Sequence, residues 1–552
     1  MYYSMKQAFM ILSLSENDKE VKEIDKFLDL LEKSGVCEVI EKHFKTDESI
    51  ENKGGRPNYN PYNMLAMILY SFAFSFASLR DMEDKCNNDL RYIYIMNNER
   101  PTFKTIGNFI NKVIIPNSDK IFSLITLQII KECKLTFDTV FIDGSKFEAK
   151  ANKYKFVWKP TTFHKKLSDK EKAILDANNI DYVSKEEEIL TSSELARAII
   201  KISDFMFDSN LMASSTKEYR KAFDSLVDCF VKGNEYEEKE RICGPNRKSY
   251  YKTDHDATAM TLKEDYYSGL GSNLHAAYNV QISVSNGLIT TYYVSQSRND
   301  INDFIPTLKK HYEMYGFYPK FVCADAGYGS FDNYEFMKTN GIENYVKYFT
   351  WEGEVSGKNP HQYILQSDGT IICLNGIIGY KMEQAPYHPR KSNSIFYKIE
   401  GCNYCPFSLY CKRYMKNKTE DFKYFEVDEE LQKHINESEE NLLSPKGIEL
   451  RVNRSCQVEG AFGILKEDMK YERFRRTTVE KVRVEFMLTA LGLNIRKLFS
   501  FFKGANPFTY WVMPENLKAE KKKKPSAKRL SKKASKVKTK SVNEQAKSSY
   551  KY

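Results

Sequence analysis

The chain has 552 residues, of which 41% are hydrophobic and 14% aromatic. This length allows two to four domains, and the composition supports large buried cores and excludes a globally disordered chain. The formal net charge of +10 is concentrated at the end of the chain, since residues 517–552 hold 14 Lys and Arg against 2 Asp and Glu, whereas the remaining residues hold 70 and 72.

The residues up to about position 135 are predicted to form a helical domain. Asn60-Pro61 and Asn98-Glu-Arg-Pro101 punctuate it, and Thr102–Lys112 reads as a capped amphipathic helix. Short helices of this kind can form a helix-turn-helix that enters the major groove of DNA. A plain helical bundle is the alternative from the spacing alone.

The longest apolar run, Met64–Leu79, lies in this helical part. It has 16 residues and contains three serines. A membrane span needs roughly 20 residues, so we expect a buried helix and no membrane partner. The eleven cysteines form no small secreted framework. We therefore expect reduced thiols and a cytoplasmic protein.

A mixed sheet is predicted in the next part of the chain, residues 136–503. The first strand is expected over residues 137–142, and Ser285-Asn-Gly287 predicts a hairpin between strands at 278–284 and 288–295. Strands at Phe321 and at 345–349 then alternate with helices near 301–315 and 334–339. Such an order is feasible for one α/β sheet under the right-handed crossover rule.

Two insertions are expected to split this sheet. Residues 165–240 are charged with helical spacing of apolar residues, which predicts a packed helical subdomain. Residues 350–440 contain cysteines, and their pattern permits a tetrahedral Zn²⁺ site. Separate reduced thiols are the alternative reading, and an iron–sulfur cluster would use similar ligands. The four candidate zinc ligands are Cys373, Cys402, Cys405 and Cys411.

Three acidic residues are the candidate catalytic groups. Asp143 follows the apolar run Thr139-Val-Phe-Ile, Asp325 follows Phe321-Val-Cys-Ala, and Glu459 lies in a helical stretch. Two carboxylates from strands and one from a facing helix make an all-oxygen site for Mg²⁺ or Mn²⁺. Paired metals of this kind activate water and stabilise the leaving oxygen of a phosphodiester. The alternative is that the aspartates are turn formers or caps and the glutamate is a solvated charge.

A further acidic segment, Thr253-Asp-His-Asp-Ala257, places two carboxylates around His255. Asp254 or Asp256 is a candidate to assist the site. A plain turn is the alternative, because Asp, His and Thr are common turn residues.

An ordered series of motifs resembles the bacterial insertion-sequence transposases that carry an Asp-Asp-Glu triad. The resemblance covers about residues 55–500, and it implies an RNase H-like catalytic domain preceded by a helical N-terminal domain, for which Pro61–Lys112 is the similar stretch. The motifs are Phe141-Ile-Asp-Gly-Ser-Lys146, Glu148-Ala-Lys-Ala-Asn152, Val157-Trp-Lys159, Tyr278-Asn-Val-Gln281, Ser297-Arg-Asn-Asp300, Ala324-Asp-Ala-Gly-Tyr-Gly-Ser330, Val458-Glu-Gly-Ala-Phe-Gly463 and Arg473-Phe-Arg-Arg476.

By this resemblance, Asp143, Asp325 and Glu459 are the triad and hold two Mg²⁺ or Mn²⁺ ions. The expected partners are double-stranded DNA, as terminal inverted repeats and target, and a second copy of the chain that pairs two element ends. The expected location is the bacterial cytoplasm at the nucleoid. The alternatives are a metal-dependent nuclease without strand transfer and an inactive or domesticated DNA-binding relic.

Related transposases often carry a Tyr-Arg-Glu-Lys signature around the third acid. Lys466 stands seven residues after Glu459, about 20° away around a regular helix, and is predicted to reach the same phosphate. The usual arginine place, four residues before the glutamate, holds Ser455; Arg454 is one residue off, and the tyrosine place is unmatched.

The last predicted segment, residues 504–552, is a basic tail without apolar periodicity, which indicates disorder. We expect it to attract phosphates without regard to DNA sequence. A solubilising terminus with no target is the alternative.

Overall fold

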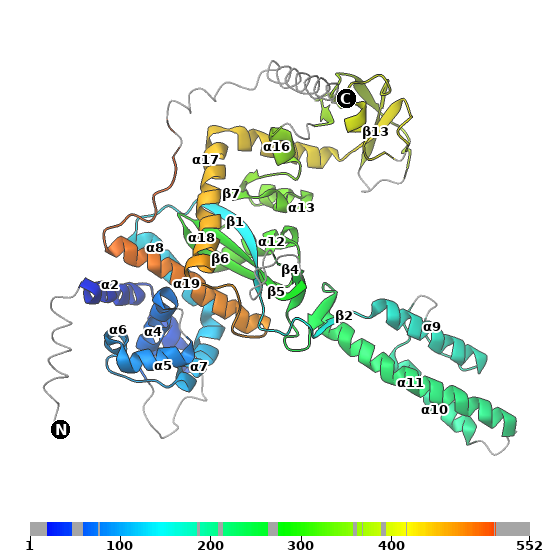
Figure 1. Cartoon of the computed structure of the whole chain (residues 1–552), viewed down its shortest axis with the longest axis horizontal. Helices are drawn as coiled ribbons and strands as arrows, with labels where there is room; N and C mark the ends of the chain where they lie inside the picture. The colour runs from blue at the N-terminus through cyan, green and yellow to red at the C-terminus, as the bar shows by residue number, and fades with distance from the viewer. Residues whose placement is uncertain are drawn as a thin grey trace, which may run out of the picture.

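The computed structural model describes residues 19–46, 59–75, 78–184, 188–207, 213–262, 274–356, 361–366, 368–387, 394–415, 417–512 and 514. Most of the predicted basic tail, from residue 515 on, lies outside these residues. Figure 1 shows three parts: a helical region, a central sheet, and two insertions that extend from the sheet.

The described residues before the sheet are helical, as the sequence predicted. Thr102 caps a helix, but no turn follows it: α7 runs through a π-helical turn, η1, into α8 without a break. The run Phe103–Glu132 is apolar enough to cross a membrane by length and composition, yet 56% of its most apolar window is buried inside the fold. The helices are α2 (Lys19–Lys33), α3 (Val36–Thr46), α4 (Pro61–Phe74), α5 (Leu79–Asn88), α6 (Leu90–Ile95), α7 (Phe103–Phe109), η1 (Ile110–Ile114) and α8 (Ile115–Glu132).

The central sheet confirms the predicted mixed α/β fold. Its strand order is β6-β5-β1-β7-β8, in which β6, β5 and β1 are antiparallel and β7 and β8 run parallel to β1; β4 also pairs with β5. The connections after β6 and β7 are helical, α12 (Phe304–Tyr315) and α13 (Phe331–Thr339). The strands are β1 (Thr139–Glu148), β4 (Thr258–Thr261), β5 (Leu274–Ser285), β6 (Leu288–Ser295), β7 (Phe321–Ala324) and β8 (Glu343–Val346).

Several predicted strand boundaries were wrong; β5, for example, begins at Leu274 rather than at residue 278. The first strand does not end before Asp143 but continues to Glu148, because β5 still pairs with β1 there. The polar run Gly-Ser-Lys hides this continuation, since strand pairing needs only backbone groups. The fifth strand begins two residues earlier than expected, at Glu343, and ends at Val346.

Helix α19 (Val479–Phe502) joins the helical region to the sheet. It packs against α4, α8 and β6, and one cluster of buried apolar residues runs through all of these elements. The closest approach is at Gly492, where an added Cβ would lie 2.6 Å from the carbonyl oxygen of Phe72. The helical region and the sheet therefore share one continuous core.

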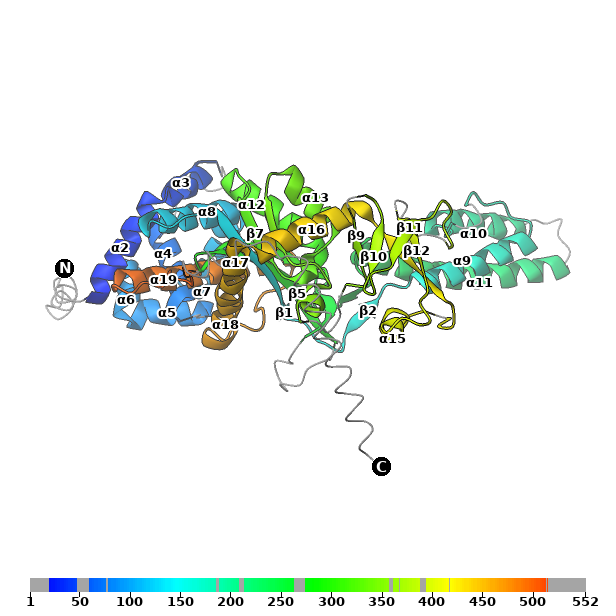
Figure 2. The same ribbon diagram turned by 90° about the horizontal axis from the view of Figure 1, so that it is seen from above.

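The first insertion is a helical arm, as predicted. Figures 1 and 2 show α9 (Thr161–Ala177), α10 (Ser192–Met206) and α11 (Ala213–Cys243) pointing away from the sheet. The arm has its own apolar cluster, which includes Leu195 and Ile202. A two-stranded ribbon, β2 (Phe156–Trp158) with β3 (Ser249–Tyr251), lies at its base.

The second insertion is a small antiparallel sheet that the sequence did not predict. We call the described part of residues 361–427 the cysteine module. Its strand order is β13-β12-β11-β10-β9, and the chain returns to the main sheet through α16 (Glu429–Leu443). The strands are β9 (Tyr363–Leu365), β10 (Ile371–Cys373), β11 (Ile378–Lys381), β12 (Ile395–Glu400) and β13 (Phe422–Val427), with a short helix α15 (Ser408–Cys411) between the last two.

Candidate active site

Asp143 and Asp325 lie side by side because of the register between two parallel strands. The last pair of β1 and β7 is Ile142 with Ala324, so the next residue of each strand is an aspartate. β7 ends at that point, and the chain turns away through the 3₁₀ turn Ala326–Tyr328. The end of β7 therefore opens a polar site beside β1.

Glu459 comes to this site from a long helix that crosses the sheet. The helix begins as α17 (Pro445–Arg454), continues as the π-helical turn η4 (Ser455–Glu459) and α18 (Gly460–Gly463), and ends in a second π-helical turn, η5 (Ile464–Asp468). A π-helix has i to i+5 hydrogen bonding, so residues five apart stack on one side. Single π-turns inside helices are frequent at functional sites.

The π-turn brings Arg454, five residues before Glu459, into the site. Its Nη2 donates to Glu459 Oε1 at 3.3 Å, while Ser455 Oγ, one residue nearer, donates to Glu459 Oε2 at 3.0 Å. Arg454 lies one residue before the usual arginine place, and the π-helical turn, whose hydrogen bonds span one more residue than those of an α-helix, compensates for this difference. A sequence pattern that assumes a regular helix does not detect this.

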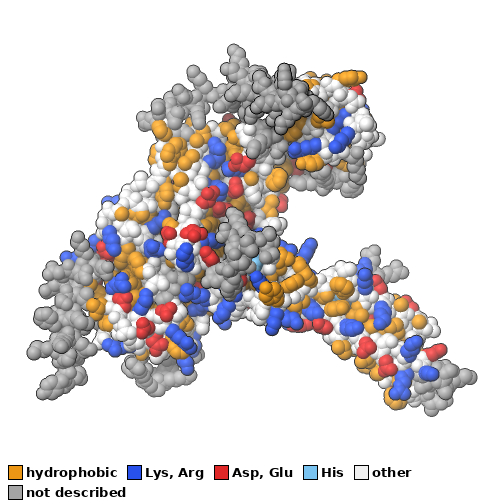
Figure 3. Space-filling view, viewed as in Figure 1, with side chains coloured by type: hydrophobic (Ala, Val, Ile, Leu, Met, Phe, Trp, Pro, Cys, Tyr) orange, Lys and Arg blue, Asp and Glu red, His pale blue; other side chains and the backbone are white. Residues whose placement is uncertain are grey.

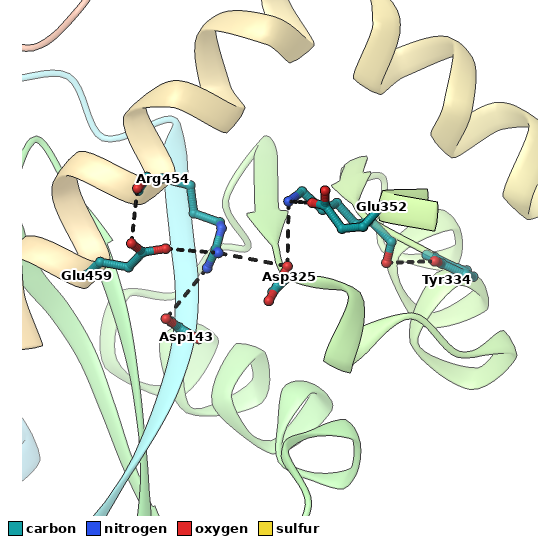
Figure 4. A network of polar contacts seen from close by, with 8 residues as sticks. Asp143, Asp325, Tyr334, Glu352, Arg454 and Glu459 are labelled. Atoms are coloured by element: carbon teal, nitrogen blue, oxygen red, sulfur yellow. Dashed lines mark hydrogen bonds and ion pairs between the residues drawn. The ribbon is translucent and has the colours of Figure 1, made fainter. Parts of the chain in front are cut away.

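The guanidinium of Arg454 lies between all three predicted triad carboxylates. It is 3.5 Å from Asp143 Oδ2, 3.8 Å from Asp325 Oδ1 and 3.3 Å from Glu459 Oε1 (Figure 4). The Arg454 side chain is only 9% exposed, whereas those of Asp325 and Glu459 are about half exposed. The three carboxylates therefore surround one position, which the guanidinium cation of Arg454 occupies.

The donor set of this position fits a hard divalent cation. Its available groups are carboxylate oxygens, which Mg²⁺ and Mn²⁺ prefer. Among the described residues, no group of three or more His, Cys, Asp or Glu stands ready to hold a metal ion; here the guanidinium lies between the acids. Binding a metal would require Arg454 to move aside.

Burial raises the pKa of Asp143 from 3.8 to about 6, although Arg454 and the hydrogen bond from Gly144 N act to lower it. Asp325 and Asp300 add smaller upward contributions. Desolvation disfavours the charged form of a carboxyl group, so the pKa of Asp143 stays raised even with the Arg454 guanidinium beside it.

Asp325 has a second basic neighbour on the other side. Lys347, which follows β8, places its Nζ 3.7 Å from Asp325 Oδ1 and 2.6 Å from Glu352 Oε1. Figure 4 shows Arg454 and Glu352 on opposite sides of Asp325. Lys347 was not a predicted site residue, since the sequence carries no motif for it.

A fourth carboxylate, Asp300, lies next to the site and was also not predicted. Its Oδ1 accepts hydrogen bonds from Asn279 Nδ2 at 2.7 Å and Gln281 Nε2 at 2.8 Å, and Tyr328 donates to Gln281. A Cβ on Gly144 would lie 2.7 Å from Asp300 Oδ1 and still closer to Gln281 Nε2, so a larger residue after Asp143 would displace these two side chains. Asp300 and its partners Asn279, Gln281 and Tyr328 lie in three of the motifs that carry the family resemblance. Membership of these motifs was the sequence signal that could have identified them.

Lys466 was expected to reach the same phosphate as Glu459, and this stays a prediction. Its Nζ donates to Ser145 Oγ at 2.8 Å and to Lys146 O at 3.3 Å, both on β1 just beyond Asp143. The predicted angle assumed a regular helix, but π-turns surround the segment between the two residues. Lys466 therefore joins the site from the β1 side.

Asp254 and Asp256 lie at the start of α19 rather than in the carboxylate cluster. Asp254 accepts from Thr478 N at 3.2 Å and from Tyr278 Oη at 2.9 Å, and Asp256 Oδ2 accepts from Val479 N at 2.9 Å. Free N–H groups at a helix start favour carboxylate partners. The turn reading of this segment fits the observed contacts.

Two family matches agree with this architecture. Residues 374–499, which include Glu459, match a family described as "Transposase DDE domain". Residues 10–112 match a family described as "Transposase domain (DUF772)". A search of curated proteins and a search of solved structures found no match. One match covers the helical region and the other reaches the third acid, and together they support an insertion-sequence transposase with a DDE catalytic domain.

Proposed function

We propose that this transposase binds the ends of its own insertion sequence and catalyses metal-dependent DNA cleavage and strand transfer through Asp143, Asp325 and Glu459. The observation that carries the proposal is the convergence of these three carboxylates on one cation position, now held by Arg454. All three come from segments far apart in the chain. Unrelated surface acids would not be expected to share one buried arginine.

In this proposal the three acids hold Mg²⁺ or Mn²⁺, two ions per site. When bound, such ions supply charge neutralisation and activation of water at the scissile phosphate. The residues of the chain supply positioning: the sheet fixes Asp143 and Asp325, and α17 fixes Glu459. Arg454, freed from the acids, and Lys466, whose Nζ donates to Ser145 on β1, are placed to bind non-bridging phosphate oxygens.

The DNA is expected to lie along the junction of the helical region and the start of α19. A cavity of about 430 Å³ lies there between α5, α7 and the segment that leads into α19. Arg476 spans it to Asn111 Oδ1 at 3.3 Å. Its basic lining residues are Lys150, Arg475, Arg476 and Lys481.

The described side chains on the face in Figure 3 form no single basic patch. Figure 3 shows Lys and Arg interspersed with Asp and Glu on the face it displays, in keeping with the near-neutral charge of residues 1–516. The proposal therefore assigns sequence-independent attraction to the basic tail and recognition of the ends to the folded body. It also includes a homodimer that pairs two ends, acting at the bacterial nucleoid.

The test is an excision and strand-transfer assay with purified full-length protein, Mg²⁺ or Mn²⁺, and DNA that carries the sequences flanking the gene. The expected products are cuts at the element ends and their joining to a target plasmid. Cuts without joining would instead indicate a nuclease. Specific binding without any cut, under both metals, would indicate a DNA-binding relic and would contradict the proposal.

A further inference from the structure

The cysteine module brings four thiols together from separate turns. Cys373 ends β10 and opens the turn to β11, where Gly376 N donates to Cys373 O at 2.9 Å. Cys402 and Cys405 follow β12 in a second turn, in which Ser408 N donates to Cys405 O at 3.0 Å. The two turns are neighbours, since a Cβ on Gly401 would lie 3.9 Å from Ile377 Cδ1.

Cys411 is tied to the same place through Lys423 of β13. The Lys423 ammonium donates both to Cys411 O and to Gln362. Gln362 precedes Tyr363, which pairs with Cys373 across β9 and β10. The cysteines therefore converge from three parts of the module, although they span 39 positions of sequence.

Cys402 and Cys405 share one turn, since Cys405 N donates to Cys402 O at 3.4 Å, and Cys411 ends the short helix α15 that follows this turn. All eleven thiols are free of disulfides.

Two lysines beside these thiols lack a carboxylate partner. Lys412 is 2% exposed, and its ammonium donates to Asn403 Oδ1 at 2.8 Å and to the carbonyls of Lys418 and Glu420. Lys423 donates only to the neutral groups named above, and burial lowers its pKa. Within the described residues neither ammonium forms an ion pair, and a buried charge without a counter-charge is costly.

The apolar core of the module is small for a sheet of five strands. Its fully buried cluster contains Ile371, Tyr397, Ile399, Phe425 and Val427, and Cys373 and Cys402 pack against it. Domains of this size usually need a disulfide, a metal or a partner for stability. The cysteines lie at the edge of this cluster, where a cross-link between them would hold the turns of the module together.

We propose that Cys373, Cys402, Cys405 and Cys411 bind one structural Zn²⁺, with Lys412 and Lys423 as the counter-charges of the site. On binding, four thiols release four protons and the zinc tetrathiolate carries a net charge of −2. The two ammonium groups then neutralise it. The side chains as described do not form a closed metal site, so zinc binding involves rotation of the thiols about their Cα–Cβ bonds.

The test is elemental analysis of full-length protein purified without chelators. We expect about one zinc per chain, and loss of that zinc in Cys405→Ser and in Cys411→Ser. The matched control is Cys37→Ser, a half-buried cysteine of α3, which should keep the zinc. In Lys423→Met and Lys412→Met we expect on the order of tenfold faster release to a chelator, as for other residues that support metal ligands.

Chelation of the wild-type protein provides a second readout, because it tests the module without mutation. Hydrogen exchange should show lost protection of β10, β12 and β13 while β1 and β5 stay protected. Iron in place of zinc, zinc retained in both cysteine variants, or metal-free protein with a fully protected module would each overturn the proposal. The Asp143→Asn variant should keep its zinc. The zinc proposal and the proposed DNA cleavage can therefore be tested separately.

Discussion

The central sheet and the cysteine module both contain at least five strands, yet they are stabilised in different ways. Helices α19, α12 and α8 pack against the sheet at β6, and its apolar cluster runs from Ile24 to Phe508. The module has a cluster of five buried residues. Asp143 lies on β1, Asp325 directly follows β7, and Glu459 lies on the helix that crosses the sheet, so the large core holds the candidate catalytic acids, while the insertions depend on cores of their own. The order of the segments along the chain therefore does not show which part of the molecule has an apolar core of its own.

The largest expected effect is on catalysis at the sheet. Asp143→Asn, Asp325→Asn and Glu459→Gln should each lower the cleavage rate by about a thousandfold, which corresponds to a loss of roughly 4 kcal/mol in transition-state stabilisation. Binding to end DNA should remain. Cleavage and mobility-shift assays run side by side measure this, with Glu467→Gln, an exposed side chain farther along the helix, as the control. Residual cleavage near the wild-type rate would remove that residue from the triad.

A matched pair of isoleucines tests whether the arm and the sheet are independent. Ile282 on β5 and Ile202 on α10 are both fully buried, and each change to Ala should cost roughly 3 kcal/mol. Ile282→Ala should lower the melting temperature of the whole fold. Ile202→Ala should reduce hydrogen-exchange protection in the arm alone. Equal loss of protection throughout the chain in both variants would show that the arm is coupled to the sheet.

The free energy of unfolding is also expected to fall in acid, because a histidine of α12, beside the sheet, is buried. His311 is buried among Phe137, Tyr315 and Phe317, and burial lowers its pKa from 6.5 to about 4. A depressed pKa means that the neutral ring stabilises the fold above pH 6.5 and that this contribution is lost as the pH falls towards 4. Over this range the wild type should lose about 3 kcal/mol more stability than His311→Phe. Parallel curves of unfolding free energy against pH would exclude this group as the cause.

The smallest expected effect concerns the contact between the helical region and the sheet. Gly492→Ala forces a methyl group against the Phe72 carbonyl and should cost about 2 kcal/mol of global stability. Gly463→Ala, another helical glycine with open space around it, should leave stability unchanged or raise it, because Ala is the better helix former. Thermal unfolding of the two variants gives the comparison. Equal melting temperatures would mean that α4 and α19 can move slightly apart without loss of stability.

Most of the sheet could be predicted from local pattern, whereas parts of the site could not. The strands around Asn286-Gly287 and the apolar run before Asp325 have strong periodic or turn signals. The role of Arg454 depends on a π-turn, which side-chain periodicity does not encode. Asp300 and Lys347 come to the site through tertiary packing, and three strands of the cysteine module, β9, β10 and β11, have only three or four residues each, too few for a periodic pattern to show.

Helix α19 has a consequence for how the protein is made. The α4 helix near the start of the chain needs α19, more than 400 residues later, as its packing partner. During synthesis the early helices therefore wait, with apolar surface exposed, until nearly the whole polypeptide has left the ribosome, and contacts of such long sequence separation form slowly. A gene copy truncated before α19 is expected to yield no folded helical fragment, and so no competitor that occupies the element ends.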